Sequence, residues 1–124
     1  MEALTNRRIL IVEDEEADRM LLSAYLHRQG CQLFYASDGL EGVEQARARQ
    51  PDLILMDSAM PGCNGRDACR ILTQDPRTSD IPVIFISGLT ASEHRVRGLL
   101  AGAVDYINKP YDFNEVKLLR YLNK

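Results

Sequence analysis

Five side chains able to take part in chemistry stand at the ends of short apolar runs. Glu13 and Asp14 follow the first run, Asp57 the third, Ser87 the fourth and Lys109 the fifth. Like-charged carboxylates at short range cannot all stay ionised without compensation, and a hard divalent cation supplies it. Oxygen ligands suit Mg²⁺, which binds through one or two carboxylates plus a phosphate oxygen. If folding brings the three acids together, they predict a Mg²⁺ site, with Mn²⁺ as an alternative ion.

The serine and the lysine complete a set that fits a phosphoryl group in transfer. Lys109 brings a positive charge opposite the metal, and Ser87 brings a short hydroxyl donor. Such groups stabilise the spread charge of a phosphoryl group by position and electrostatics rather than by an elaborate proton relay. Asp57 is then the nucleophile, as carboxylates are where aspartyl phosphates form. We therefore expect Asp57, Ser87 and Lys109 to carry the chemistry.

The elements that must position these residues alternate along the chain. Three of the apolar runs are continuous, which is typical of strands covered on both faces of a parallel sheet. The expected strands span 9–12, 33–36, 53–56, 83–86 and 104–107. The expected helices span 16–29, 39–49, 65–74, 91–101 and 113–123. Right-handed crossovers then predict an α/β fold, with helices on both faces of a five-stranded parallel sheet and the polar residues along its carboxyl edge, where the strands end.

Two details of the helices lead to separate expectations. The first helix stops at Gly30, a natural C-terminal residue. Its apolar side is expected to consist of Met20, Leu21, Ala24 and Tyr25. Gly42 lies inside the second helix, where glycine costs about 1 kcal/mol relative to alanine, and the sequence offers no functional reason for it.

Composition limits the class of protein. A chain of 124 residues with a net charge of −3 fits one domain and lacks the basic excess that a nucleic-acid backbone requires. We expect residues 1–7 to be flexible and residues 8–124 to form the domain. Three cysteines without a CxxC pair favour reduced thiols. With no signal peptide or apolar span, the expected location is the cytoplasm, without membrane contact.

At these residues the sequence resembles the receiver domains of bacterial response regulators, chemotaxis regulators among them, which act in two-component phosphorelays. The resemblance runs from Ile9 to about Leu122. The matching stretches are Ile11-Val12-Glu13-Asp14-Glu15, Leu55-Met56-Asp57, Met60-Pro61-Gly62, Asn64-Gly65, Pro82-Val83-Ile84-Phe85-Ile86-Ser87-Gly88, Ala101-Gly102-Ala103, Asp105-Tyr106 and Lys109-Pro110. Their order and spacing together are specific. The resemblance implies a (βα)5 doubly wound, flavodoxin-like sheet in the order 2-1-3-4-5.

The resemblance also implies individual roles. Asp57 would accept the phosphoryl group and bind the metal together with Asp14, while Glu13 would act mostly through water. The backbone carbonyl of Ala59 would complete the metal contacts. Ser87 and Lys109 would contact the phosphoryl oxygens, and the Lys109-Pro110 peptide bond is expected to be cis. Glu13 and Ser87 replace the more usual Asp and Thr.

A switch and a set of partners follow from the same resemblance. Tyr106 would swing inward when Ser87 moves toward the phosphate, which shifts the population between two packings of 91–101, 104–107 and 113–123. Candidate partner contacts on this face are Arg95, Arg97, Asp105, Glu115, Lys117 and Arg120. The expected partners are a sensor histidine kinase or phosphotransfer protein, a downstream effector domain or protein, and a second copy in a homodimer through this face.

The positions two residues beyond Asp57 and Ser87 tune phosphate hydrolysis in the family. Ala59 and Leu89 stand there, and neither side chain can orient a water molecule. A long-lived phosphorylated form with slow autodephosphorylation is therefore expected. The chain would assist its own phosphotransfer without being an enzyme that turns over external substrates.

Three other functions compete with this interpretation. A phosphatase similar to the haloacid dehalogenases needs a second aspartate two residues after the first, and Ala59 stands there. A nucleotide-binding domain needs a glycine-rich first turn, but residues 13–16 are all acidic and would repel phosphates. A receiver-like protein-interaction module that acts without phosphorylation remains the alternative.

Overall fold

The structure is a computed structural model that describes residues 4–57, 65–87, 102–108 and 121–122. Five strands and three helices alternate along these residues, and residues 121–122 are also helical. The strands are β1 (Arg8–Val12), β2 (Gln32–Ala36), β3 (Leu53–Asp57), β4 (Val83–Ser87) and β5 (Asp105–Asn108). The helices are α1 (Glu16–Arg28), α2 (Gly39–Arg49) and α3 (Gly65–Gln74). The expected helix 91–101, and 113–123 apart from residues 121–122, lie outside the described residues.

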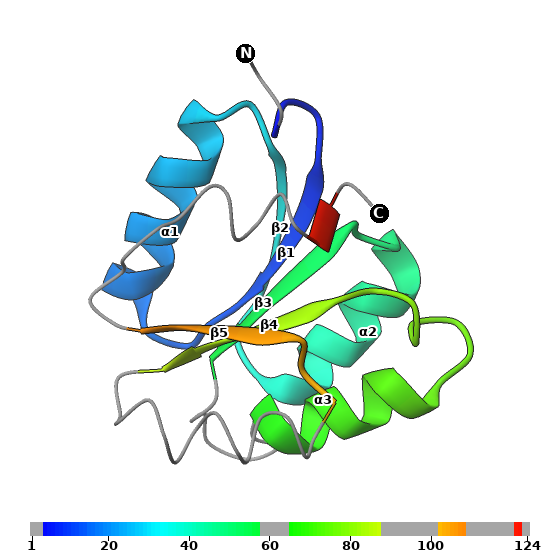
Figure 1. Ribbon diagram of the computed structural model, residues 1–124. Coiled ribbons are helices and arrows are strands. Elements are labelled where there is room, and N and C mark those ends of the chain that lie inside the picture. The colour runs from blue at the N-terminus through cyan, green and yellow to red at the C-terminus, as the bar shows by residue number, and fades with distance from the viewer. Residues whose placement is uncertain (1–3, 58–64, 88–101, 109–120, 123–124) are drawn as a thin grey trace.

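All five strands are parallel and form one sheet in the order β2-β1-β3-β4-β5. This confirms the expected order. The order reverses at β1, which lies between β2 and β3, and ligands of such sheets bind beyond the carboxyl ends of the strands at this reversal. In Figure 1, α1 lies on one face of the sheet, and α2 and α3 lie on the other. The doubly wound arrangement therefore holds for the described helices.

The sheet separates two apolar cores because successive side chains of a strand point to opposite faces. One core lies under α2 and α3 and includes Leu10, Val12, Val43, Ile54, Met56, Cys69, Leu72 and Phe85. The other lies under α1 and includes Ile9, Ile11, Leu22, Leu26, Leu53, Leu55, Ile84 and Ile107. Every side chain of β3 is buried, so the strand that ends in Asp57 is held from both sides.

The buried face of α1 differs from the expectation. Leu22 and Leu26 are fully buried, whereas Met20 and Leu21 are 63% and 60% exposed. Ala24 is also exposed, and Tyr25 is only half-buried against the core. Apolar residues surround this helix on more than one side, so the approach of the helix to the sheet selects which of two overlapping stripes is buried.

Residues 4–7, the described part of the segment 1–7, contact the domain, Leu4 and Asn6 among them. Leu4 is 1% exposed and packs in the core under α1. The backbone N–H of Asn6 donates to the Gly30 carbonyl at 2.8 Å, and the Cys31 thiol donates to the Leu4 carbonyl at 3.4 Å. Burial of one leucine and these contacts attach this part of the segment to the end of α1.

The packing of α2 against β1 explains the glycine at position 42. A Cβ atom at this position would lie 2.9 Å from Cγ2 of Val12, closer than side-chain carbons normally approach. Glycine therefore lets α2 lie directly on β1 at Val12, the residue that precedes Glu13.

Two of the three cysteines are described, and both are buried free thiols. Burial raises the pKa of Cys31 and of Cys69 to about 11, which makes both inert. None of the helices in the described part of the chain combines the length and the apolar composition that a membrane span needs.

Candidate functional site at the carboxyl edge

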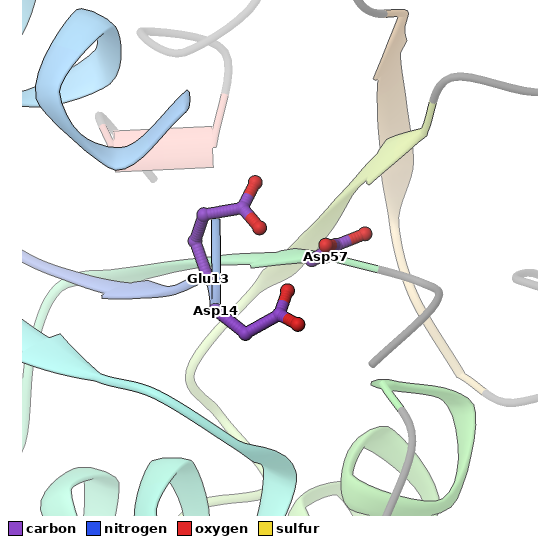
Figure 2. Close-up of side chains that lie close together, drawn as sticks. All are labelled: Glu13, Asp14 and Asp57. Atoms are coloured by element: carbon purple, nitrogen blue, oxygen red, sulfur yellow. The ribbon is translucent and has the colours of Figure 1, made fainter. Parts of the chain in front are cut away.

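Two neighbouring strands deliver the three predicted acids to one place. Glu13 and Asp14 form the turn between β1 and α1, and Asp57 is the last residue of β3. Val12 is paired with Met56 in the parallel register, so the residues that follow them emerge side by side. Figure 2 shows the result, with Asp57 reaching from the end of β3 and the other two side chains from the turn.

The three acids form a compact oxygen cluster. One carboxylate oxygen from each residue lies within 4.8 Å of the others. Glu13 is 0% exposed and Asp57 is 5% exposed, whereas Asp14 lies at the surface. Carboxylates that converge away from water repel one another unless a positive charge joins them. The cluster therefore combines two buried oxygen donors with one open side.

This donor set fits Mg²⁺. The ion takes hard oxygen ligands, is bound through one or two carboxylates, and keeps positions open for water or phosphate oxygens. Glu13, Asp14 and Asp57 are the described residues that would hold it.

The turn that carries Glu13 is held at three points. The N–H of Glu13 donates to the Ala36 carbonyl at 3.0 Å, which attaches it to β2. The N–H of Glu15 donates to Oε2 of Glu13 at 3.2 Å. Nη1 of Arg19, from the first turns of α1, donates to the Glu13 carbonyl at 3.2 Å. Sequence reasoning missed Arg19, although a basic residue near a helix N-terminus is an unusual choice that could have signalled it.

The other predicted site residues are only partly described. The backbone of Ser87 ends β4 and is paired with Asn108 on β5, which places both at the carboxyl edge. The side chain of Ser87 lies outside the described part, as do Ala59, Lys109 and Pro110 together with their peptide bond. Their roles stay predictions.

Tyr106 is half-buried on β5 and packs against the core under α2 and α3. It is paired with Phe85 on β4, two residues before Ser87. Its N–H donates to Oδ1 of Asp105 at 2.8 Å, and the Tyr121 hydroxyl donates to Oδ2 of the same carboxylate at 2.9 Å. Asp105 thus joins β5 to the C-terminal part of the chain. The other candidate partner contacts, Arg95, Arg97, Glu115, Lys117 and Arg120, lie outside the described residues.

Comparison with known proteins agrees with this geometry. A family model described as the response regulator receiver domain matches residues 9–120. Protein PilH of Pseudomonas aeruginosa is 44% identical over 116 residues, which cover 94% of each chain. Other curated relatives are longer, and the chain spans 45%, 23% and 48% of the length of three of them.

Solved structures show the same fold. A putative response regulator from Chloroflexus aurantiacus superposes with a TM-score of 0.91 at 26% identity, covering 97% of this chain and 100% of the other. The receiver domain of sensor histidine kinase PA1611 from Pseudomonas aeruginosa, with a magnesium ion coordinated in its active site cleft, gives 0.82 at 29% identity and covers 96% of each chain. From its fold, its acidic cluster and these likenesses, the chain belongs to the response regulator receiver domain family of two-component signalling.

Proposed function

We propose that this receiver domain is a Mg²⁺-dependent phosphoacceptor and that Asp57 takes the phosphoryl group. The observation that carries the proposal is the convergence of Glu13, Asp14 and Asp57, with oxygens within 4.8 Å of one another at the strand-order reversal. The magnesium ion in the cleft of the related PA1611 receiver domain supports the same ion here. Receiver domains generally bind Mg²⁺ and accept phosphoryl groups rather than act as enzymes.

In the proposed reaction, one Asp57 oxygen attacks the phosphorus of the donor. An O–P bond forms, the bond to the donor breaks, and the leaving group keeps the bonding electrons. Bound Mg²⁺ would neutralise charge on the phosphoryl oxygens. Glu13 and Asp14 would hold that ion beside Asp57, whose own strand is buried on both faces and keeps its carboxylate in place. In the proposal, Ser87 and Lys109 contact the phosphoryl oxygens, and the Ala59 carbonyl completes the metal contacts.

The phosphorylated state would then shift the packing of β5. We propose that Tyr106 turns further inward as Ser87 approaches the phosphate. The half-buried position of Tyr106 beside the Phe85 register position supports this, because the ring already lies at the boundary of the core. The face formed by 91–101, β5 and 113–123 would present the change to an effector or to a second copy.

Response regulators work with histidine kinases and effectors. For this chain we propose a sensor kinase or phosphotransfer protein as the donor and a cytoplasmic location, in keeping with three cysteines that form no CxxC pair. With Ala59 and Leu89 beyond the acceptor and the switch residue, we also propose slow hydrolysis of the phosphate.

The test uses intact-protein mass spectrometry after incubation with acetyl phosphate and Mg²⁺. Wild-type protein should gain the mass of one phosphoryl group, and Asp57→Asn should gain none. Asp52→Asn is the matched control, because Asp52 directly precedes the same strand at its other end. It should be modified like wild type.

Two results would contradict the proposal. One is full modification of Asp57→Asn. The other is equal modification of wild-type protein when Mg²⁺ is removed by a chelator. A chain that takes no phosphate under any condition would favour the alternative, an interaction module that acts without phosphorylation.

A further inference from the structure

We propose that Arg19 is a positioning residue that holds the Glu13-Asp14 turn in the geometry that receives the cation. The inference rests on the proposed Mg²⁺ site. It adds a residue outside the acidic cluster that acts on the cluster through the backbone.

The first line of support is a hydrogen bond from the side chain of Arg19, on α1, to the backbone of the turn. Nη1 of Arg19 donates to the Glu13 carbonyl at 3.2 Å in a partly buried position. This carbonyl belongs to the peptide bond between Glu13 and Asp14, so the guanidinium holds the link between two of the three acids. On the other side of the turn, the Glu15 N–H donates to Oε2 of Glu13 at 3.2 Å. The backbone of Arg19 is fixed beside the turn, because its N–H makes the first helical hydrogen bond of α1, to the Glu15 carbonyl at 2.9 Å.

The presence of an arginine at this position is better explained by its contact with the turn than by helix formation. Arg19 is the fourth residue of α1, where the helix dipole favours acids, and Glu16 and Asp18 follow that preference. A basic residue here opposes the dipole, so helix formation does not account for it. Residues that break a local rule tend to lie at functional sites. A guanidinium also fits a fixed contact better than the ammonium of lysine, since its planar fork is pre-organised.

Two possible roles for Arg19 predict opposite changes in Mg²⁺ affinity when its side chain is removed. As a nearby positive charge, it would repel Mg²⁺, and its removal would tighten binding. As a positioning group, it keeps two ligands converged, and its removal would weaken binding. Loss of groups that orient metal ligands typically weakens metal affinity about 10- to 100-fold. Because Arg19 acts through one carbonyl, we expect the lower end of this range.

The experiment measures Mg²⁺ affinity by isothermal titration calorimetry on the unphosphorylated chain at constant ionic strength. Arg19→Met should bind Mg²⁺ about tenfold more weakly than wild type. Arg19→Lys keeps the charge and one reachable donor, so its affinity should lie between the two. Arg28→Met is the matched control, because exposed Arg28 ends the same helix and its removal changes the net charge equally. Its affinity should equal that of wild type.

A second measurement needs no metal. Amide hydrogen exchange followed by NMR should show loss of protection at the Glu15 N–H in Arg19→Met, and partial recovery in Arg19→Lys. Unchanged or tighter Mg²⁺ binding in folded Arg19→Met would overturn the inference, as would unchanged protection of Glu15. If Arg19→Met does not fold, Arg19→Lys alone decides by the same two criteria. If wild-type protein binds no Mg²⁺, the proposed function fails, and the exchange data still decide whether Arg19 holds the turn.

Discussion

The two edges of the sheet hold their carboxylates in opposite environments. At the amino edge, where the strands begin, the acids meet donors. Asp52 accepts the Arg8 N–H at 2.8 Å, and Asp75 accepts Nε of Arg47 at 2.8 Å and Nη2 of Arg77 at 3.0 Å. The first contact joins the starts of β1 and β3, and the Arg47–Asp75 contact connects α2 to the segment that follows α3. Each acid thereby stabilises the fold.

At the carboxyl edge, the acids face one another. Glu13, Asp14 and Asp57 lie with oxygens within 4.8 Å, and two of them are buried. Carboxylates this close repel one another, and a bound cation would offset that repulsion. The comparison shows that one sheet disperses its carboxylates among basic and backbone donors at one end and gathers three of them at the other.

The largest expected effect is the stabilisation of the folded protein by Mg²⁺, which should depend on the carboxyl edge and not on the amino edge. Mg²⁺ at about 100 times its Kd should stabilise wild-type protein by about 2.7 kcal/mol, because it binds only the folded cluster. Asp14→Asn should lose most of that gain, since it removes one of the three ligands. Asp80→Asn, at an exposed position near the amino edge, is the control with the same change in charge. Urea unfolding with and without Mg²⁺ measures the difference, and equal stabilisation of Asp14→Asn would contradict the cluster as the binding site.

A smaller effect concerns the support of the carboxyl edge. Gly42→Ala should destabilise the protein by about 1 kcal/mol, although alanine favours helices. The added Cβ would lie 2.9 Å from Cγ2 of Val12, a stiff β-branched side chain in a buried strand. Urea unfolding measures the change, with Glu44→Ala on the exposed side of the same helix as the control. If Gly42→Ala were more stable than wild type, α2 would have to shift away from β1 and make room for the new Cβ at no loss of stability.

The amino edge should respond to acid. Hydrogen bonds from Arg77, and then from Arg47, hold the pKa of Asp75 well below its usual range. A lowered folded-state pKa contributes stability that is present above the unfolded pKa of about 3.9 and is lost as pH falls below it. Asp75→Asn should therefore be less stable than wild type at about pH 6, and the gap should narrow below about pH 4. Urea unfolding across this range tests it, and a gap independent of pH would argue against these ionic contacts.

The smallest expected effect lies on the same edge. The Arg8 and Arg49 guanidinium carbons lie 5.1 and 5.2 Å from the centre of the Phe34 ring. Arg49→Met should cost about 0.5 kcal/mol, as exposed cation–π contacts do. The loss should disappear in a Phe34→Leu background, which a double-mutant cycle by urea unfolding would show. A cost that persists there would assign the effect of Arg49 to other contacts.

Much of the fold and part of the site could be predicted because they depend on short-range patterns. A buried strand reads as a continuous apolar run, and β2 and β4 match the expectation to within one residue at each end. The β5 strand begins one residue later than expected, at Asp105. Since parallel strands end at one edge, the alternation of elements placed Glu13, Asp14 and Asp57 at that edge. Their proximity also requires β1 and β3 to be neighbours, an order that only the family resemblance implied.

The buried face of α1 could not be predicted in the same way. Leu21 and Leu22 are adjacent, as are Tyr25 and Leu26, so two stripes about 100° apart are equally apolar in the sequence. Only the packing of the helix on the sheet places Leu22 and Leu26 inside. A pattern within one element reports its period, but not the direction from which another element approaches.

By itself, the sequence determined the alternation of strands and helices and the set of acids at the strand ends, because periodicity and chain order are local properties. The tertiary structure decided that Gly42 meets Val12 and that Arg19 turns back to the Glu13 carbonyl. Such contacts depend on the distance and rotation between packed elements. Those quantities are set by the fit of all side chains in the two cores together, and no single segment encodes them.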